Sequence, residues 1–431
     1  MHILITLSGE GRRFIQAGYR CPKFLMEIDK HPIIEHLVHL FPGEKKITFI
    51  CRPDLLEKTD LRELLQKIAP SYQMLPVLPH QKGPVYSIVQ RVDCISDEEE
   101  LVINYCDFSM GWNYNDFLQT IRNYDADGAI VAYRGFHPHL PGTTNYAFLR
   151  AEQQIFLEAR EKVPFTTDPY QEYISTGTYY FKRGDSVKKY FPKLLELPWD
   201  IQGEYYVSLV YNLMQQEGLK TILYEVPYML QWGTPRDVEA YRFWSDYFGA
   251  LKHALAHEVV VPPLLDWKKY LNAIDPEQPV RISWGSHGIL WNPPLFELFR
   301  ESTNADFILW SFRQRTQTSF PIQEEHLSLK IDSSQTIVSF LSPTPLEQIQ
   351  SGAFVDTKVW YFRQAKTLLS MFSLLETFPS EDPQFFFSLG NLLLEKGFKG
   401  KIFEVDFYCP LGTFDLYRTF CYWQKFFNRR L

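Results

Sequence analysis

The sequence predicts an α/β fold in two successive units, and three features of the chain support this prediction. Short apolar runs alternate with segments of helical periodicity through the first quarter of the chain, an order that is typical of a parallel sheet covered by helices on both faces. The chain has 431 residues, which is longer than one hydrophobic core usually serves. Sequence features of the first half also recur in the second half at a nearly constant spacing.

The first elements follow from the spacing of apolar residues. The predicted strands cover 3–7, 47–51 and 101–105. The predicted helices cover 32–40, 55–68 and 84–92. Ligands of such sheets bind at the carboxyl ends of the strands. The turns at 8–14 and 106–111 each follow a predicted strand, so we expect them to meet at one edge of the sheet.

Charge and cysteine content limit the classes of partner. The net charge is −7, with no basic run before Arg429-Arg430, whereas binding to nucleic acid or anionic membrane needs a basic surface. The six cysteines form no C-x-x-C pair and no zinc spacing, which is typical of reduced thiols. No run approaches the ~20 apolar residues of a membrane span, and the apolar run 2–7 is too short for a signal peptide. We therefore expect a cytoplasmic protein that binds neither nucleic acid nor membrane.

A turn with two glycines after the first strand predicts a phosphate site. The two segments concerned are Ser8-Gly9-Glu10-Gly11-Arg12-Arg13-Phe14 and Pro22-Lys23-Phe24. Gly9 and Gly11 let backbone amides approach phosphate oxygens closely. Arg13 adds a planar fork of donors, and Lys23 adds a mobile positive charge. Cations at these places lower the barrier to displacement at an α-phosphate, so we expect Ser8 and its neighbours to bind a nucleoside triphosphate.

Other polar residues admit two interpretations each. Asp107 follows a predicted strand, where a carboxylate suits Mg²⁺, although an aspartate there more often caps a helix or closes a turn. Glu161-Lys162 is by itself typical of a solvated surface pair. His137-Pro138-His139 lies in a Pro/Gly-rich stretch without further metal ligands, so we expect a solvent-exposed loop there.

The turn at 8–14, together with Gly18-Tyr19 and Pro22-Lys23, resembles the opening of the sugar-phosphate nucleotidyltransferase family, especially members from capsule and surface-polysaccharide pathways. The resemblance covers residues 1 to about 248. It implies a glycosyltransferase-A-like fold with a Rossmann-like mixed sheet and dependence on Mg²⁺. It also implies transfer of a nucleotide onto a sugar phosphate, phosphocholine or a similar group, with release of pyrophosphate. In this family the counterpart of Arg13 binds the triphosphate, that of Lys23 contacts the α-phosphate, and that of Asp107 is a metal ligand.

Further site residues follow from the same resemblance. Gly83, in a glycine loop before a helix, would lie against the nucleobase. Glu161 would meet sugar hydroxyls, and Lys162 would meet the substrate phosphate. Gly177 would leave room for the sugar.

The second metal ligand departs from the family pattern. Family members often carry an aspartate two residues before a late Gly-Thr, and this chain has Gln231 at that position. A neutral amide coordinates a metal only weakly. Asp237 lies nearby, although an acid there also suits the first turn of a helix. The second ligand is therefore open between Gln231 and Asp237.

An internal repeat supports the second unit. The part of the chain from residue 94 to residue 248 has an echo at 273–427, at an offset of about 179 residues. At that offset Trp112-Asn113 falls on Trp291-Asn292. We therefore predict a nucleotidyltransferase domain at 1–250, a connection at 251–272 and a degenerate partial repeat of the same architecture at 273–431.

The second domain lacks counterparts of the predicted site residues. Asp107 falls on Ser286, and Gly177 falls near Lys358. The echo also begins too late to contain a phosphate loop. We therefore expect this domain to be non-catalytic, most simply a packing partner, with homo-oligomerisation or binding of a sugar or regulator as alternatives.

Two other functions remain open at this point. A glycosyltransferase of the same fold would consume a nucleotide sugar, but such enzymes commonly carry an Asp-x-Asp motif, and Asp107 is followed by Phe108-Ser109. A non-catalytic nucleotide- or sugar-binding regulatory protein is the second alternative, suggested by Gln231. The expected partners are a nucleoside triphosphate, with CTP or GTP to be tested first by family analogy, and a phosphorylated sugar or small metabolite.

Overall fold

The computed structural model describes residues 1–251, 256–260, 275–283, 287–314, 325–372, 383–411 and 413–430. The chain divides into two compact units, Met1–Tyr241 and Arg242–Leu431, which we call unit 1 and unit 2. The boundary falls within helix α9 (Pro235–Leu251). Most of the predicted connection at 251–272 lies outside the described residues, and the domain limits predicted from the sequence remain predictions.

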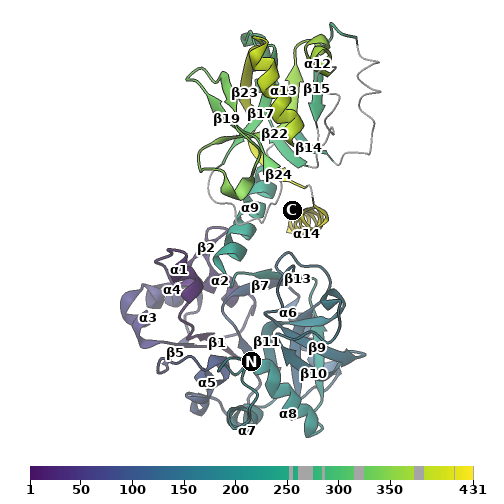
Figure 1. Ribbon diagram of the computed structural model, residues 1–431. Coiled ribbons are helices and arrows are strands. Elements are labelled where there is room, and N and C mark those ends of the chain that lie inside the picture. Colours follow the sequence, from purple (N-terminus) through teal and green to yellow (C-terminus); the bar gives the residue numbers. More distant parts are fainter. Residues whose placement is uncertain are drawn as a thin grey trace. The chain divides into compact units, whose positions relative to one another are not determined.

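Unit 1 is built on a nine-stranded mixed sheet in the order β5-β4-β1-β6-β11-β8-β12-β10-β9 (Figure 1). Strand β1 pairs in parallel with both β4 and β6, and β11 is antiparallel to β6 and β8. The strands are β1 (His2–Leu7), β4 (Lys46–Cys51), β5 (Gln73–Pro76), β6 (Leu101–Asn104), β8 (Gly128–Tyr133), β9 (Ala147–Glu152), β10 (Ile155–Glu161), β11 (Tyr173–Phe181) and β12 (Thr221–Glu225). Two short ribbons pair β2 (Glu27–Ile28) with β3 (His31–Pro32) and β7 (Phe108–Gly111) with β13 (Tyr228–Gln231). The three strands predicted in the first quarter of the chain are confirmed as β1, β4 and β6.

The helices of unit 1 connect these strands. They are α1 (Arg12–Gln16), α2 (Ile33–His39), α3 (Pro53–Lys58), α4 (Leu61–Ile68), α5 (Gly83–Val89), α6 (Tyr114–Asn123), α7 (Gly184–Leu195), α8 (Val210–Gln216) and α9, with 3₁₀ turns η1 (Lys23–Leu25), η2 (Val92–Cys94), η3 (Pro169–Gln171) and η4 (Val207–Leu209). The single helix predicted over 55–68 is wrong, because α3 and α4 are separate. Thr59 has an extended backbone (φ −140°, ψ 158°), and its hydroxyl donates to the carbonyl of Leu55 at 2.6 Å. This side-chain hydrogen bond competes with continuation of the helix.

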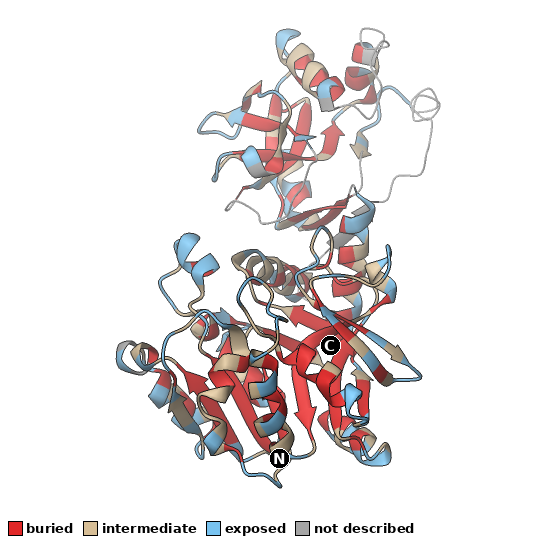
Figure 2. Cartoon of the chain, turned by 60° about the horizontal axis from the view of Figure 1, so that its bottom comes forward, coloured by how far each residue is buried: buried red, intermediate tan, exposed pale blue. Residues whose placement is uncertain are grey.

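The core of unit 1 lies on both faces of the central strands. Every residue of β1, β6 and β8 is buried (Figure 2). Strands buried on both faces have continuous apolar runs rather than alternating ones, which explains why β1 and β6 could be predicted from the sequence. Burial on both faces leaves only the strand ends accessible to a ligand.

Unit 2 contains a six-stranded sheet in which β20-β19-β22-β17-β23 are successive neighbours and β15 also pairs with β22. A second, three-stranded sheet has the order β14-β16-β24. The strands are β14 (Ala256–Val260), β15 (Val280–Ser283), β16 (His287–Trp291), β17 (Phe307–Arg313), β18 (Glu325–His326), β19 (Ser328–Ile331), β20 (Ile337–Phe340), β21 (Thr344–Pro345), β22 (Phe354–Phe362), β23 (Gly400–Glu404) and β24 (Phe407–Pro410). The helices are α11 (Pro293–Ser302), α12 (Ala365–Phe372), α13 (Pro383–Glu395) and α14 (Phe414–Arg430), with a 3₁₀ turn η5 (Leu346–Gln348).

Units 1 and 2 share several local features at corresponding positions. Strand β8 pairs antiparallel with β11 and parallel with β12, and β17 pairs antiparallel with β22 and parallel with β23. Both antiparallel pairings contain a shift in register. Asn113 and Asn292 each cap the following helix by accepting a hydrogen bond from a backbone amide.

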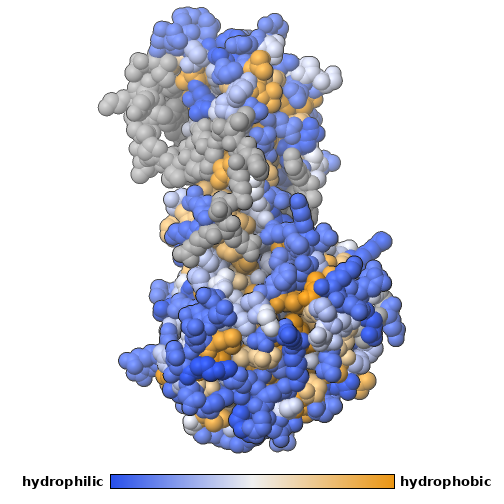
Figure 3. All heavy atoms as spheres, turned by 180° about the vertical axis from the view of Figure 1, so that it is seen from behind, coloured by the Kyte–Doolittle hydropathy of each residue, from blue (hydrophilic) through white to orange (hydrophobic). Residues whose placement is uncertain are grey.

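No helix within the described residues is long and apolar enough to cross a membrane. On the face of unit 1 drawn in Figure 3, hydrophilic side chains surround small groups of hydrophobic ones. Scattered exposed hydrophobic side chains are ordinary for a folded protein surface.

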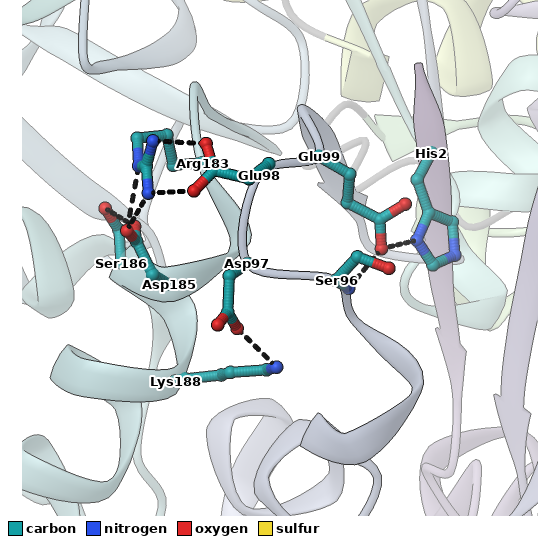
Figure 4. Close-up of polar contacts among 9 residues, drawn as sticks. All are labelled: His2, Ser96, Asp97, Glu98, Glu99, Arg183, Asp185, Ser186 and Lys188. Atoms are coloured by element: carbon teal, nitrogen blue, oxygen red, sulfur yellow. Dashed lines mark hydrogen bonds and ion pairs between the residues drawn. The ribbon is translucent and has the colours of Figure 1, made fainter.

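Glu99 connects the amino ends of the parallel strands β1, β4 and β6. Figure 4 shows its contacts with His2 and Ser96. Its carboxylate contacts the ring of His2 at 3.1 Å and accepts from the backbone amide of Ser96 at 2.7 Å and from the ammonium of Lys46. The other ring nitrogen of His2 lies 2.8 Å from the hydroxyl of Thr48. This cluster lies at the end of β1 that is opposite to the turn at 8–14.

Glu99→Gln should destabilise unit 1 in a pH-dependent way. Burial alone would raise the pKa of Glu99, but the hydrogen bonds from Lys46, Ser96 and His2 lower it below its usual value. A lowered pKa means that the ionised carboxylate stabilises the fold above about pH 4.3 and that this contribution is lost as the pH falls further. We expect a loss of about 1–2 kcal/mol in the free energy of unfolding at pH 7, measured by urea denaturation.

The matched control is Glu98→Gln, because the side chain of Glu98 is 77% exposed and pairs with Arg183 at the surface. This variant should unfold like the wild type. An equal loss in both variants, or a loss in Glu99→Gln that persists unchanged at pH 3, would contradict the role given to Glu99.

Candidate functional site

The turn predicted to bind phosphate lies at the carboxyl end of β1. Residues 8–11 leave the strand, and Gly11 has a left-handed backbone (φ 67°) at the start of α1, which carries Arg13. Lys23 begins the 3₁₀ turn η1. The chain leaves the sheet after Leu7 and has returned to the same edge by Lys23.

Lys23 and Asp107 form an ion pair at this edge. Asp107 follows β6, and its Oδ2 lies 3.0 Å from Nζ of Lys23, with side chains that are 30% and 17% exposed. Burial alone would lower the pKa of Lys23, but the charge of Asp107 and its hydrogen bond raise the pKa above its usual value. The lysine is therefore firmly cationic. The structure thus brings together two residues that are 84 positions apart in the sequence.

Gln231 and Asp237 lie beside Asp107. A Cβ atom on Gly233 would lie 2.6 Å from Nε2 of Gln231 and 3.2 Å from Oδ2 of Asp107, so both groups border the same glycine. Oδ2 of Asp237 accepts from the amide and the hydroxyl of Thr234, at 2.9 and 2.6 Å. Burial and the nearby charge of Asp107 raise the pKa of Asp237 to about 6, although the hydrogen bonds from Thr234 act against this shift. The charge of Arg236 also lowers the pKa of Asp237, but the effects of burial and of Asp107 are larger.

Asp107 and Asp237 are carboxylates of the kind that could hold Mg²⁺. Among the described residues, no group of three or more His, Cys, Asp or Glu side chains could hold a metal ion. Mg²⁺ usually takes one or two carboxylates and completes its shell with substrate phosphates and water. Asp107 supplies one carboxylate, and the raised pKa of Asp237 indicates a second carboxylate that a cation would stabilise.

Glu161 and Lys162 are not a surface pair. Glu161 ends β10 with only 7% of its surface exposed, and its Oε1 accepts a hydrogen bond from the hydroxyl of Ser208. Lys162 has a left-handed backbone (φ 61°), its amide donates to the carbonyl of Tyr146 at 2.9 Å, and its ammonium lies 5.2 Å from the centre of the Tyr206 ring. Burial raises the pKa of Glu161 to about 7, against the effects of Ser208 and Lys162. A buried acid with this pKa beside a lysine is typical of a functional site.

Glycines allow two close approaches around these residues. Gly177 has φ 98°, and a Cβ there would meet the rings of Tyr105 and Phe108 at 3.0 and 3.1 Å. The space over Gly177 is thus bordered by aromatic rings. Gly83 has φ 78°, and a Cβ there would lie 2.7 Å from the carbonyl oxygen of Tyr205. This contact joins the start of α5 to the segment that carries Tyr206.

Two tyrosines near the site were not identified from the sequence. Burial raises the pKa of Tyr146, and the charges of Asp237, Asp107 and Arg13 also act on it. Burial likewise raises the pKa of Tyr206, whose hydroxyl donates to Glu204. These electrostatic contacts place both phenols among the predicted site residues. In a chain with 25 Tyr, nothing local separates them from core aromatic residues.

The exposed loop predicted at His137-Pro138-His139 is wrong. His137 is only 2% exposed, and its ring lies 4.4 Å from the ring of Tyr133. The hydroxyl of Tyr133 lies 2.8 Å from Nε2 of His139. Ring packing against β8 outweighs the Pro/Gly-rich composition of this stretch.

No protein-family model matches the chain, and no curated protein matches it in sequence. Solved structures that resemble it include a nucleoside-diphosphate-sugar pyrophosphorylase from Vibrio cholerae RC9, at 18% identity over 56% of this chain and 99% of that chain, with a TM-score of 0.47. Another is a putative glucose-1-phosphate thymidylyltransferase from Bacillus anthracis in complex with a sucrose, at 15% identity over 56% of this chain and 94% of that chain, with a TM-score of 0.45. Each likeness spans just over half of the present chain.

Glu161→Gln should stabilise the protein at alkaline pH. A raised pKa means that the protonated carboxyl is the form that suits the fold. Stability is therefore lost as the pH rises from about 4.3, the usual pKa of a glutamate, to about 7. Glutamine cannot ionise and can still accept from Ser208. At pH 8 we expect a gain of roughly 1–3 kcal/mol over the wild type, measured by urea denaturation.

At pH 3 the two proteins should unfold alike, because Glu161 is then protonated in both the folded and the unfolded state. Glu158→Gln is the matched control, because Glu158 is a carboxylate on the same strand that pairs with Arg150 and Arg160 at the surface. A pH-independent difference for Glu161→Gln would show that Glu161 is not a buried acid of raised pKa.

Proposed function

We propose that unit 1 is a nucleotidyltransferase that joins a phosphorylated sugar, or a similar small phosphorylated substrate, to a nucleoside triphosphate with release of pyrophosphate. The observation that supports this most directly is the ion pair of Lys23 and Asp107 beside a glycine-containing turn that leads into α1, the helix that carries Arg13. It combines a cation for phosphate with a carboxylate for a metal at the carboxyl edge of the sheet, where ligands of α/β sheets bind.

The triphosphate would lie along the turn at 8–14. Backbone amides near Gly9 and Gly11 suit phosphate oxygens, and Arg13 suits the outer phosphates because guanidinium groups form paired hydrogen bonds. Lys23 would move from Asp107 toward the α-phosphate as the substrate enters. Charge that develops on the equatorial oxygens and on pyrophosphate would then face two cations.

Asp107 would hold Mg²⁺, with Asp237 or Gln231 as a second ligand. A Mg²⁺ ion held there would supply positive charge to neutralise the phosphate oxygens. Of the two candidates, Asp237 is the better metal ligand. Burial and Asp107 raise its pKa, so a bound cation would stabilise its ionised carboxylate. Gln231 lies close to the same place but offers only a neutral oxygen.

The phosphorylated acceptor would lie between β10 and β11. Lys162 would contact its phosphate, Glu161 would accept hydrogen bonds from its hydroxyl groups, and Gly177 would border it. The attacking phosphate oxygen is anionic at neutral pH, so no general base is needed. What these side chains must supply is orientation for in-line attack. CTP or GTP as donor, and precursors of capsule or surface polysaccharide as products, belong to this proposal by analogy only.

For unit 2 we propose a degenerate, non-catalytic copy of part of unit 1. Support comes from the matching strand pairings of β8 and β17 and from the matching caps Asn113 and Asn292. Lys358 occupies the position that corresponds to Gly177, again with a left-handed backbone (φ 66°). Ser286, the counterpart of Asp107, lies outside the described residues. Bracing unit 1 and homo-oligomerisation in the cytoplasm are the roles proposed for it.

A non-catalytic nucleotide-binding protein is the second candidate, because Gln231 stands where a metal carboxylate is expected. The two candidates differ in turnover. Purified protein with Mg²⁺, each of the four nucleoside triphosphates and a panel of phosphorylated sugars and small metabolites should release pyrophosphate with one pair. Stabilisation by a nucleotide without any turnover across the panel would favour the non-catalytic protein.

Lys23→Ala and Asp107→Asn should each lower pyrophosphate release by roughly 100-fold or more, because each removes a charge aimed at the phosphates. The chain offers a matched pair of controls, Lys182→Ala and Asp125→Asn, since these residues form an ion pair at the surface with 38% and 87% exposure. The controls should keep activity and melting temperature. A site variant that loses melting temperature in proportion to activity would contradict the assigned roles.

Asp237→Asn should remove a pH dependence of Mg²⁺ binding. With a pKa of about 6, the wild-type carboxylate is largely ionised above that pH and protonated below it, so Mg²⁺ affinity should rise between pH 5 and pH 7. Calorimetric titration with MgCl₂ and the non-hydrolysable form of the preferred nucleotide would measure this.

Asn at position 237 should flatten the profile and weaken binding several-fold at pH 7. Gln231→Ala is the discriminating control, because it should leave the pH profile intact. If Gln231→Ala instead weakened Mg²⁺ binding and Asp237→Asn kept the pH profile of the wild type, the second ligand would be Gln231.

A further inference from the structure

A chain of three hydrogen-bonded side chains runs from the turn before α5 to the end of β1. It begins at His80, whose Nδ1 accepts from the backbone amide of Lys82 at 3.1 Å. A backbone N–H can only donate, so Nδ1 carries no proton and the proton of the neutral ring lies on Nε2. Burial, and then the charge of Lys82, lower the pKa of His80, which favours this neutral ring.

The direction of the next hydrogen bond follows from this tautomer. Nε2 of His80 lies 2.8 Å from Oγ of Ser87, so Ser87 is the acceptor. Oγ of Ser87 lies 2.7 Å from Oγ of Ser8. Within the described part of the chain, the hydroxyl of Ser87 contacts only these two partners, and Ser87 is fully buried. Its proton must therefore go to Ser8, because the reverse direction would leave a buried donor without an acceptor.

Ser8 is left with one proton to give. Its oxygen already accepts from Ser87, and no described residue accepts from its hydroxyl. Ser8 is half-buried and is the first residue after β1. The hydroxyl is thus a donor of defined direction at the edge where the triphosphate is proposed to bind.

The ring of His80 is held in place from one side. It packs edge-on against the ring of Tyr86 at 4.8 Å, and the ammonium of Lys82 lies 4.8 Å from the centre of that same ring. Tyr86 and Ser87 both belong to α5, which begins at Gly83 against Tyr205. The chain of hydrogen bonds is therefore anchored in the same segment that borders the proposed nucleobase position.

We infer that Ser8 donates a hydrogen bond to an acceptor atom on the base of the bound nucleotide, and that His80 and Ser87 are positioning residues that fix its direction. The inference rests on the proposed function. An acceptor on the base is a carbonyl oxygen or an unprotonated ring nitrogen. A neutral hydroxyl suits such a neutral acceptor, whereas Arg13 and Lys23 already offer full charges to the phosphates.

The test is calorimetric binding of each nucleoside triphosphate to the full chain, with inorganic tripolyphosphate as the probe that lacks a base. Ser8→Ala, Ser87→Ala and His80→Phe should each weaken binding of the preferred nucleotide by roughly 5- to 20-fold. Tripolyphosphate should bind all of them as it binds the wild type. Ser186→Ala, which removes a surface hydroxyl that contacts Asp185, is the matched control and should change nothing.

A double-mutant cycle separates positioning from general damage. Ser8→Ala combined with His80→Phe should bind no more weakly than Ser8→Ala alone, because His80 acts only through that hydroxyl. Additive losses would overturn the positioning role. If His80→Phe lowers the melting temperature, the same cycle can be measured with Ser87→Ala in its place. Equal weakening of tripolyphosphate by Ser8→Ala would assign the hydroxyl to phosphate and overturn the base contact.

Failure of this inference can be told apart from failure of the proposed function. A wild type that binds a nucleotide and releases pyrophosphate, with Ser8 and His80 variants that bind equally well, contradicts the inference alone. A wild type that binds none of the four nucleotides contradicts both.

Discussion

The parallel pairing of β1 with β6 is the constraint on which the candidate site depends. His2 lies opposite Leu101 and Ile5 opposite Asn104, so the residues that follow the two strands emerge at the same edge. Asn104 fixes this end of β6, because its side chain is buried and accepts from the hydroxyl of Thr178 at 2.6 Å. A slip of one residue would turn alternate side chains to the other face. The contact between Lys23 and Asp107 is thus a consequence of strand register, set by residues that have no chemical role of their own.

The charges gathered at this edge do not balance by themselves. Asp237 and Glu161 both have pKa values raised chiefly by burial, to about 6 and about 7. Lys23 is already paired with Asp107, and no described basic side chain pairs with Asp237. A bound cation would stabilise the ionised form of Asp237 and would also reduce repulsion between the carboxylates and a triphosphate. The raised pKa of Asp237 is thus one reason for proposing Mg²⁺ at this edge.

Local patterns predicted the strands at 3–7, 47–51 and 101–105 and the turn that contains Gly9, because these features depend on neighbouring residues. The last part of the predicted turn, with Arg13, is helical in the structure. The break at Thr59 and the burial of His137 were missed, since both depend on side-chain contacts that outweigh composition. The places of Tyr146 and Tyr206 beside the site depend on pairings between strands far apart in the sequence. The same is true of the hydrogen bonds that join His80 to Ser8. None of these residues is distinctive in the sequence, because the direction of each hydrogen bond depends on the three-dimensional arrangement of its partners.

The bulge of β11 at Gly177 and the bulge of β22 at Lys358 can be compared directly. At the register shift of β11, the amide of Gly177 donates to the hydroxyl of Ser175 at 3.1 Å. At the shift of β22, the amide of Lys358 donates to the carboxylate of Asp356 at 2.9 Å. Both positions have a left-handed backbone, although that conformation costs a lysine of order 1 kcal/mol that glycine avoids. The hydrogen bond that shapes the bulge is therefore kept with different side chains, while a long cationic chain stands where unit 1 has none. This pair of positions agrees with the proposal that unit 2 is a non-catalytic copy, because the shape of the strand is the same and the side chain that would border a substrate differs.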